Sequence, residues 1–595
     1  MNHGQADNAD RSPPDRIGVA LSGGGFRAAF FHLGVLAQMA RQGLLRHVEV
    51  ISTVSGGSIV GALYYVHLKN LLESKEDGEI ADGDYEAIVY RMHREFRHGV
   101  ERNLRTRTFG HLLKNIRMSR PDYSRSDRIG ELYDEYFYRP AFDADRTGPV
   151  EMRELKIHPP GEPDDFHPSI HNHDRAAKVP ILLINATTLN TGHHWRFEAS
   201  RMGAPLRSSD LLRQIDKNTR LRQPPDYESI PEHQQNLELG LAVAASAAVP
   251  GLFHPLALSG LYPDARVELV DGGVHDNQGI QALLDSGCTR FIISDAAGQL
   301  GFQANPPSSI LSVLLRTNMI LTARVREEQL VRLMERPDRP VAFMHLRRGL
   351  EAPEISWIGR DGRPAGAPPE APAAGSGSDA FGVAPEVQDR LSRVRTDLDA
   401  FSEVEAWSLM LNGYRMSEWE LGRVPFFARL AEESEQRPEA DWEFLAVEPF
   451  MKRPTRQYLA HLDAAARSVM RVFQLNPRLQ PVGRALQLGL IGGTAALIVS
   501  SWVAGDDLVR TTGLVGLTVL GLALLQQTIE SWGHRLPWGI RSAVQTITRF
   551  ITRGLPRALV TPVVWFHLLL LNPLFLRAGR LERLVPPEDG AEGGS

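Results

Sequence analysis

The stretch Ile51-Ser52-Thr53-Val54-Ser55-Gly56-Gly57-Ser58-Ile59-Val60-Gly61 decides the fold that we expect for this chain. It begins inside a run from Val48 to Val54 that is mostly apolar and β-branched, which is typical of a buried strand. Small residues, Gly61 and Ala62, then favour a closely packed helix. A serine followed by glycines between a strand and a helix forms a tight elbow, which exposes the hydroxyl at the edge of a sheet. We therefore predict that Ser55 is a nucleophile.

A strand, a loop and a helix precede this elbow. The apolar run Ile17–Leu21 predicts a buried strand, and Ser22-Gly23-Gly24-Gly25 after it predicts a tight loop. The next apolar segment extends to about Gln42 and is closed by Gly43, a residue that often ends a helix. This order indicates βαβ units, so the sequence predicts an α/β fold with a parallel sheet.

Composition narrows the classes of function. The chain has 595 residues and a formal net charge of -5, which gives no support for nucleic-acid binding. Its one cysteine, Cys288, excludes an internal disulfide framework and fits a reducing compartment. Residues 1–16 are polar and contain no apolar core, so we expect a disordered leader and no secretory signal.

The apolar residues are concentrated near the C-terminus. Residues 485–504 form an apolar run about as long as a bilayer-spanning helix, and residues 511–525 form a second, shorter run. Arginines outside the pair predict that both outer ends face the cytoplasm. Residues 540–551 place apolar side chains on one helical face and arginines opposite, which suits a helix on an anionic membrane surface. The alternative is a buried hydrophobic hairpin in a soluble domain.

A serine nucleophile needs a base and donors for its oxyanion. The loop at Ser22–Gly25 is able to supply backbone donors, although a dinucleotide-binding loop is an alternative for a glycine-rich turn of this kind. Asp271 is the candidate base, because it follows the apolar run Val267–Val270 and precedes two glycines, although an ordinary Asp-Gly turn is the alternative. A Ser-His-Asp triad is the alternative to a carboxylate base that acts alone. The histidines near these segments are His32, His194, His254 and His275, and no context singles one out.

Taken together, these residues resemble the patatin-like phospholipase family. Gly23-Gly24-Gly25-Phe26-Arg27 resembles its glycine-rich motif, Thr53-Val54-Ser55-Gly56-Gly57 its nucleophile elbow, and Asp271-Gly272-Gly273 its D-G-G/A motif. Supporting stretches are Ala245–Pro250 and Arg395–Asp399. The resemblance spans roughly residues 17–300, with a weaker echo near 385–415, and the order of the motifs makes the set specific.

The resemblance implies a three-layer α/β sandwich with a mostly parallel central sheet and a Ser-Asp dyad without histidine. Carried over, Ser55 attacks the ester carbonyl and Asp271 acts as general base. The resemblance implies an oxyanion hole from the backbone amides of Gly23, Gly24, Gly25 and Gly56. Arg27 matches the basic position and is assigned to substrate or anion binding. No metal-ligand spacing is present, and neither a metal nor another cofactor is expected.

The chain departs from the family pattern at the first glycine of the elbow, which is Thr53 here. Because a β-branched side chain fills space in a tight turn, this departure predicts a crowded elbow.

We expect a disordered leader at 1–16 and a patatin-like hydrolase domain at 17–475, with a flexible insertion near 360–380. A helical membrane-associated region is expected at 476–585, with a candidate transmembrane hairpin at 485–525, and a disordered tail at 586–595. The leading hypothesis is a membrane-attached serine lipid acyl hydrolase, of phospholipase A or lysophospholipase type. Its expected substrate is a phospholipid or lysophospholipid, and its catalytic domain is expected on the cytoplasmic side of the membrane. The alternatives are a non-catalytic lipid-binding or scaffolding protein on a hydrolase fold, and an acyltransferase.

Overall fold

The computed structural model describes residues 15–111, 114, 123–205, 219–298, 300–336, 338–352, 354–360, 364–365, 377–434, 441–467, 471–475, 481, 564–565 and 567–586. The predicted hairpin at 485–525, the helix at 540–551 and most of the predicted insertion near 360–380 lie outside these residues. Within the described residues, no helix is both long enough and apolar enough to cross a membrane.

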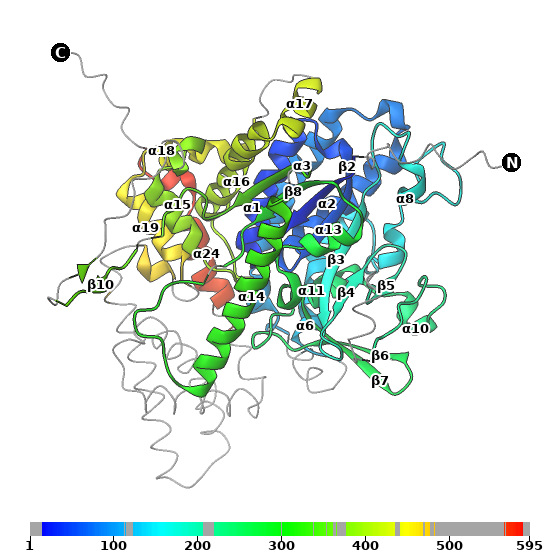
Figure 1. Ribbon diagram of the computed structural model, residues 1–595, viewed down its shortest axis with the longest axis horizontal. Helices are drawn as coiled ribbons and strands as arrows, with labels where there is room; N and C mark the ends of the chain where they lie inside the picture. The colour runs from blue at the N-terminus through cyan, green and yellow to red at the C-terminus, as the bar shows by residue number, and fades with distance from the viewer. Residues whose placement is uncertain are drawn as a thin grey trace, which may run out of the picture. The chain divides into compact units, whose positions relative to one another are not determined.

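The chain forms two compact units, and Figure 1 labels their helices and strands. Unit 1 comprises Met1–Gly99, Arg117–Met344 and Glu420–Ala440, and unit 2 comprises Val100–Ile116, His345–Trp419 and Asp441–Ser595. All the residues of the predicted active site belong to unit 1. The predicted domain boundaries remain predictions.

Unit 1 is built around a sheet that has nine strands in the described part of the chain. Its central strands are parallel and follow the order β3-β2-β1-β8. They are β1 (Ile17–Leu21), β2 (Val48–Val54), β3 (Ile181–Thr188) and β8 (Arg290–Asp295). Strand β9 (Val341–His345) lies beyond β8. Every residue of β1 is buried, as its unbroken apolar sequence predicts for a central strand.

The sheet is mixed, whereas the sequence predicted a mostly parallel one. Antiparallel pairing joins β3 to β4, β4 to β5, β3 to β7 and β6 to β7. These strands are β4 (His194–Phe197), β5 (Met202–Gly203), β6 (Leu256–Tyr262) and β7 (Ala265–Asp271). Apolar runs predict that a strand forms but not its direction, which depends on distant pairing partners.

Helices cover both faces of the sheet, which confirms the α/β class. On one face, Ala20, Val50 and Phe291 share a buried apolar cluster with α13 (Ile280–Asp285). The alternate strand residues point to the opposite face. There α1 (Gly25–Arg41) contacts β8, and α2 (Gly56–Ser74) contacts β1, β2 and β3.

Further helices of unit 1 enter the arguments below. They are α3 (Asp82–Glu101), α6 (Arg125–Tyr133), α8 (Pro168–His171), α11 (Leu239–Ser246), α12 (Gly273–Asp276) and α14 (Ile310–Met334).

Unit 2 is helical and contains a buried group of charges. Its helices include α15 (Pro385–Arg393), α18 (Glu448–Lys452), α19 (Arg456–Ala465) and α24 (Asn572–Ala578). The charged group consists of Arg105, Arg395, Arg471, Asp397, Asp399 and Glu405. Burial alone would raise the pKa of Asp399, but Arg471 and Arg105, each 3.0 Å away, hold it well below its usual range.

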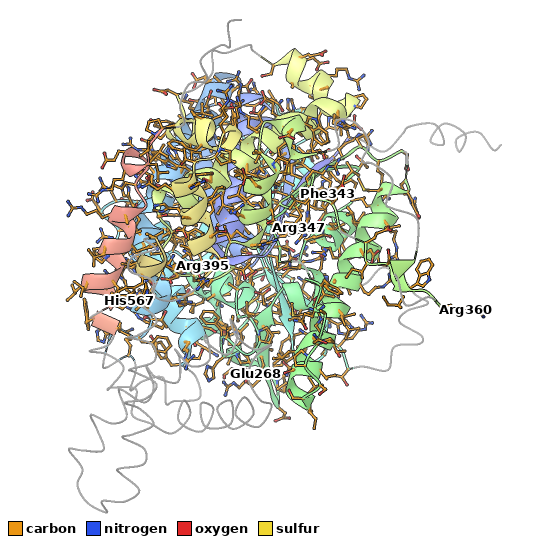
Figure 2. All side chains as sticks on the ribbon, turned by 90° about the vertical axis from the view of Figure 1, so that its left-hand side faces the viewer. Glu268, Phe343, Arg347, Arg360, Arg395 and His567 are labelled. Carbon is orange, nitrogen blue, oxygen red and sulfur yellow. The ribbon has the colours of Figure 1, made fainter. Side chains whose placement is uncertain are left out.

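This cluster explains the supporting stretch Arg395–Asp399. Arg395, labelled in Figure 2, donates to the Ala400 carbonyl oxygen and pairs with Glu405. Since each buried arginine has a carboxylate partner, the stretch acts as an internal ion-pair core of unit 2.

Candidate active site

The register of the sheet brings the three predicted motifs together. Leu21 pairs with Thr53 across β1 and β2, and Val54 pairs with Asn185 across β2 and β3. On the other side of β3, Ala186 pairs with Asp271. The glycine loop, the elbow and the aspartate therefore leave adjacent strands near the same edge of the sheet, where α/β folds commonly place their sites.

Ser55 forms the elbow between β2 and α2. Its φ of 50° and ψ of −117° lie in a region that non-glycine residues rarely adopt, so surrounding contacts must hold it there. The Ser55 amide donates to Ser246 Oγ at 2.9 Å. Its carbonyl oxygen accepts from the amides of Ser58 at 2.9 Å and Ile59 at 3.2 Å. These contacts fix the elbow by its backbone and leave the hydroxyl available.

The two glycines after Ser55 allow the elbow to pack against the glycine loop. A Cβ at Gly56 would lie 2.1 Å from the carbonyl oxygen of Gly25, and one at Gly57 would lie 2.2 Å from that of Leu21. The Gly57 amide also donates to the Ser22 carbonyl oxygen at 3.1 Å. Any side chain at these positions would separate the loop from the nucleophile.

The backbone donors expected of an oxyanion hole lie at two helix starts. Gly25 is the first residue of α1 and Gly56 the first of α2, and amides of a first turn have no acceptor within their own helix. Gly24, with a φ of 145°, and Gly25, with a φ of 60°, adopt conformations that favour glycine.

Gly23 differs from the expectation. Its amide already donates to the Asn277 carbonyl oxygen at 3.0 Å. A Cβ at Gly23 would lie 2.3 Å from Asn277 Oδ1 and 3.2 Å from Ser55 Cβ. Gly23 thus permits close packing beside the nucleophile, and its amide is committed to Asn277.

Asp271 ends β7 and accepts a hydrogen bond from the Ser55 side chain. Its Oδ1 also accepts from the Gly273 amide at 2.7 Å. Burial raises the pKa of Asp271 to about 6, and the hydrogen bonds from Gly273 and Ser55 oppose this rise. The carboxylate is therefore more basic than an ordinary aspartate and already in contact with the serine hydroxyl.

Ser246, at the end of α11, links the nucleophile to the base. Its Oγ accepts from the Ser55 amide, lies 2.9 Å from Ser58 Oγ, and donates to the Asn185 carbonyl oxygen at 2.6 Å. Its own carbonyl oxygen accepts from the Gly272 amide at 3.2 Å. The Ala245–Pro250 stretch resembles the family, but no local sequence signal indicates this role of Ser246.

The predicted crowding at Thr53 is relieved by Gly61, one turn into α2. A Cβ at Gly61 would lie 2.5 Å from Thr53 Cγ2, so the absent side chain provides the space for the threonine methyl group. Thr53 Oγ1 donates to the Leu183 carbonyl oxygen at 3.1 Å and accepts from Ser58 Oγ at 3.0 Å. Thr53 therefore supports the elbow.

Arg27 was assigned to substrate or anion binding, and the structure gives it a different setting. The side chain is buried, and its Nε and Nη2 donate to the Ala296 carbonyl oxygen at 3.2 and 2.7 Å. Burial lowers the pKa of Arg27 to about 10, and the charge of Asp295 opposes this. These contacts hold the chain that leaves β8 against α1, and substrate or anion binding by Arg27 stays a prediction.

His32 also contacts the ends of β1 and β8, close to Arg27. Its ring nitrogens lie 2.6 Å from Ser294 Oγ and 2.9 Å from the Ser22 carbonyl oxygen. Burial lowers the pKa of His32 to about 4, against the opposing effects of the Ser22 hydrogen bond and Asp295. The ring centroids of His194 and His275 lie 3.7 Å apart, so these two histidines contact each other. The Ser55 hydroxyl instead has the Asp271 carboxylate as its hydrogen-bond partner.

Tyr133, at the end of α6, is a neighbour of the site that sequence reasoning missed. The side chain is fully buried, and its hydroxyl has no hydrogen-bond partner in the part of the chain that the structure describes. Burial raises the pKa of Tyr133, and the charge of Asp271 adds to the rise, which places the phenol within electrostatic range of the carboxylate. No local pattern in its sequence signals this, because α6 lies far from Asp271 in the chain.

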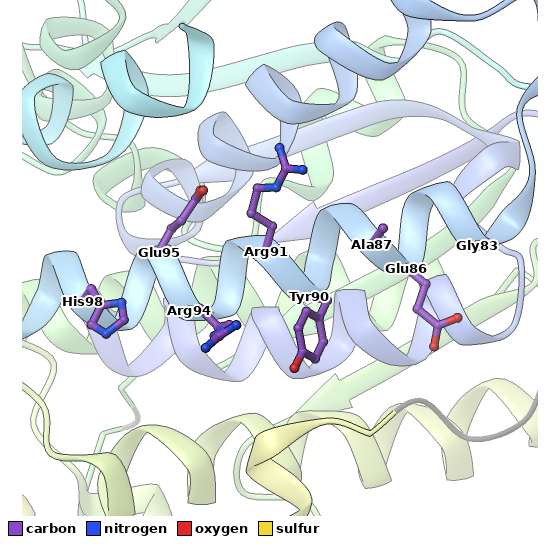
Figure 3. A pocket seen from close by; sticks show the side chains of 8 residues that line it. All are labelled: Gly83, Glu86, Ala87, Tyr90, Arg91, Arg94, Glu95 and His98. Carbon is purple, nitrogen blue, oxygen red and sulfur yellow. The ribbon is translucent and has the colours of Figure 1, made fainter. Parts of the chain in front are cut away.

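An open pocket of about 620 Å³ lies elsewhere in unit 1, along α3 (Figure 3). Its lining residues fall between Gly83 and His98 and include none of the residues described above. It is separate from the Ser55–Asp271 site.

Comparisons with known proteins agree with these motifs. Residues 19–284 match the family model for patatin-like phospholipases, a range that contains the glycine loop, Ser55 and Asp271. This match confirms the resemblance to the patatin-like phospholipase family that the sequence predicted. No curated protein matches the sequence.

Three solved structures show partial likeness. Human GIVD cytosolic phospholipase A2, in complex with methyl gamma-linolenyl fluorophosphonate inhibitor and terbium chloride, has 14% identity over 70% of this chain and 60% of its own, with a TM-score of 0.34. A second structure of that human protein has 12% identity over 72% and 64%, with a TM-score of 0.35. VipD from Legionella pneumophila has 13% identity over 96% and 92%, with a TM-score of 0.24. The chain thus spans 60% and 64% of the two human phospholipase chains.

Proposed function

We propose that this protein is a serine lipid acyl hydrolase that cleaves fatty-acyl esters of phospholipids or lysophospholipids with a Ser55–Asp271 dyad. The family match over residues 19–284 supports lipid hydrolysis in general. The observation that carries the dyad is the hydrogen bond from the Ser55 side chain to a buried carboxylate whose pKa is raised to about 6. At neutral pH such a carboxylate is mostly ionised and is a stronger base than an exposed aspartate.

In the first half of the reaction, Asp271 accepts the Ser55 hydroxyl proton while Oγ attacks the ester carbonyl carbon. The carbonyl oxygen becomes an oxyanion, for which the amides of Gly24, Gly25 and Gly56 are the proposed donors. When the intermediate collapses, the bond to the lipid alcohol breaks and Asp271 returns the proton to that alcohol. The fatty acyl group remains esterified to Ser55.

In the second half, water replaces the alcohol. Asp271 takes a proton from the water molecule as its oxygen attacks the acyl-enzyme carbonyl carbon. Collapse of the second intermediate breaks the bond to Ser55 Oγ, which recovers its proton from Asp271, and the fatty acid is released. Ser246 keeps nucleophile and base in register throughout, because its Oγ binds the Ser55 amide and its carbonyl oxygen binds the Gly272 amide.

Membrane attachment is part of the proposal. It rests on the apolar runs at 485–504 and 511–525 and on the arginines that flank them, which favour a catalytic domain on the cytoplasmic side. Attachment would concentrate the enzyme at its substrate without any additional contact to the lipid.

The test combines fluorophosphonate labelling with measurement of released fatty acid. Ser55→Ala should abolish labelling and lower the rate by at least about a thousandfold, and Asp271→Asn should lower the rate to a similar degree. Ser74→Ala is the matched control, because Ser74 lies on the same helix but is exposed, with its hydroxyl bonded to the Leu71 carbonyl oxygen. Undiminished labelling or hydrolysis in either dyad variant would refute the assignment. Acyl lipid formed in place of free fatty acid would identify an acyltransferase.

A further inference from the structure

The N-terminal half of α14 presents apolar side chains outward. Towards its C-terminal end the helix is anchored, since Leu333 is buried in the apolar cluster under β8 and Leu330 packs against it. By contrast Ile310, Leu314, Leu321 and Val325 are 82%, 62%, 59% and 39% exposed. We call these four residues the outer stripe.

The outer stripe occupies one face of the helix. Its members are spaced by four, seven and four residues, so they lie on the same side of the helix, with Thr317 on that side between Leu314 and Leu321. Val313 is exposed beside the stripe, and Leu315, Met319 and Ile320 are exposed on other sides of the same helix. A surface helix ordinarily carries polar residues on its outer face, and a large exposed apolar surface marks an interaction site.

We infer that the outer stripe is an interfacial surface that inserts into a phospholipid bilayer containing anionic lipid. This inference deepens the proposed function and rests on it for the lipid nature of the substrate. A lipid surface suits an aliphatic stripe, because the energetic centres of protein interfaces are enriched in Trp, Tyr and Arg, whereas Leu and Val are under-represented there. Phe302, which is 76% exposed shortly before the helix, extends the apolar surface.

Charge supports an anionic membrane surface. From Ile310 to Arg326 the helix carries Arg316, Arg324 and Arg326 and no acidic residue. The acidic residues of α14, Glu327 and Glu328, come only in its later turns, where Arg324 reaches Glu327 at 3.3 Å. The half of the helix with the exposed apolar side chains therefore has a net positive charge, as helices that rest in an anionic interface commonly do.

The position of α14 connects the stripe to the active site. Helix α14, labelled in Figure 1, contacts α12, which begins two residues after Asp271, and both elements belong to unit 1. Insertion of the stripe would thus hold the edge of the sheet that carries the dyad next to the lipid surface. Such docking acts through this helix, independently of the C-terminal apolar runs.

The test places a fluorescent reporter on the stripe of the full-length chain. Cys288 is the chain's one cysteine and is 4% exposed, so an environment-sensitive dye would label a cysteine introduced as Leu314→Cys. Ser55→Ala in the same chain prevents hydrolysis of the vesicles. Ile170→Cys is the matched control, because Ile170 is 70% exposed in α8, outside the stripe. The probes are vesicles of phosphatidylcholine with and without phosphatidylglycerol.

We expect a blue shift at position 314 with phosphatidylglycerol vesicles, quenching by nitroxide lipids, and neither response at position 170. The inference would be overturned by an unchanged spectrum at position 314 or by an equal change at position 170. A spectral change that follows protein concentration in the absence of lipid would also overturn it, because a second copy of the chain would then be the occupant. An equal response to neutral vesicles would overturn the anionic requirement. In the otherwise native chain, Leu314→Ser with Leu321→Ser should lower the ratio of vesicle to soluble-ester hydrolysis by about tenfold or more.

The two readouts separate this inference from the proposed function. Insertion at position 314 without any ester hydrolysis would support the membrane surface and refute the hydrolase. Hydrolysis of vesicle lipid with no spectral response at position 314 would support the hydrolase and refute the membrane surface.

Discussion

Replacing the proposed base, Asp271→Asn, should abolish activity and at the same time stabilise the folded protein at alkaline pH. The carboxylate is buried, and its pKa rises from 3.8 to about 6 on folding, chiefly because burial disfavours the charged form. A rise of about 2 pK units corresponds to about 3 kcal/mol of folding free energy at a pH where the group is ionised in both states. Asparagine is similar in shape and carries no charge, so the variant avoids this cost.

The sign of the pH dependence follows from the direction of the shift. Because the folded pKa lies above the unfolded value, the folded state binds the proton more tightly, and this stabilisation is present below pH 3.8 and lost as pH rises through about 6. The advantage of Asp271→Asn over the native chain should therefore be about 3 kcal/mol at pH 8 and fall to roughly 1 kcal/mol at pH 4.5.

The assay compares urea midpoints of paired variants at these two pH values, since the difference between variants depends less on extrapolation than either free energy of unfolding. Ser55→Ala is the control with the opposite sign. It removes a hydrogen bond that stabilises the ionised carboxylate, so it should destabilise the protein more at pH 8 than at pH 4.5. A lower midpoint for Asp271→Asn at pH 8, or an equal gain at both pH values, would refute burial as the cause of the shift.

Three other predictions concern the same site. The rate constant kcat/KM should rise about tenfold per pH unit up to about pH 6 and then level off, because Asp271 must be ionised to accept a proton; a flat pH–rate profile would contradict this role. Ser246→Ala should lower the unfolding free energy by about 1–3 kcal/mol and also reduce ester release, because the buried Ser55 amide loses its acceptor; unchanged values would show that Ser246 is dispensable. Gly61→Ala should destabilise by about 1–3 kcal/mol through the clash with the methyl group of Thr53, and adding Thr53→Ser, which removes that methyl group, should recover most of the loss; purely additive effects in the double-mutant cycle would contradict the contact.

Local sequence signals were sufficient for the α/β class, the glycine loop and the elbow. Each depends on residues adjacent in the chain: apolar runs for strands, and glycines where the backbone must turn sharply or come close to another segment. The elbow at Ser55 illustrates this, since both glycines after it are required by contacts below 2.5 Å that any Cβ would make.

Roles that depend on distant partners were not readable in the same way. Arg27 carries a charge that suits an anion, and the sequence did not show that two of its nitrogens donate to the carbonyl oxygen of Ala296, which lies 269 residues away. Gly23 belongs to the right motif, yet its amide is committed to Asn277. Thr53 violates the family pattern, and the compensation by Gly61 becomes visible only when α2 is folded against β2.

The sequence by itself determined the kinds of chemistry available to this protein: a serine at a strand–helix turn, backbone donors in a glycine loop, and an acid at a strand end. Only the tertiary structure decided how these groups are used. The antiparallel pairing of β7 with β3 brings Asp271 to Ser55, burial raises the pKa of the carboxylate, and the packing of α14 leaves its outer stripe exposed. The physical reason is that backbone conformation follows from near neighbours along the chain, whereas desolvation, hydrogen-bond partners and exposure depend on segments that meet only after folding.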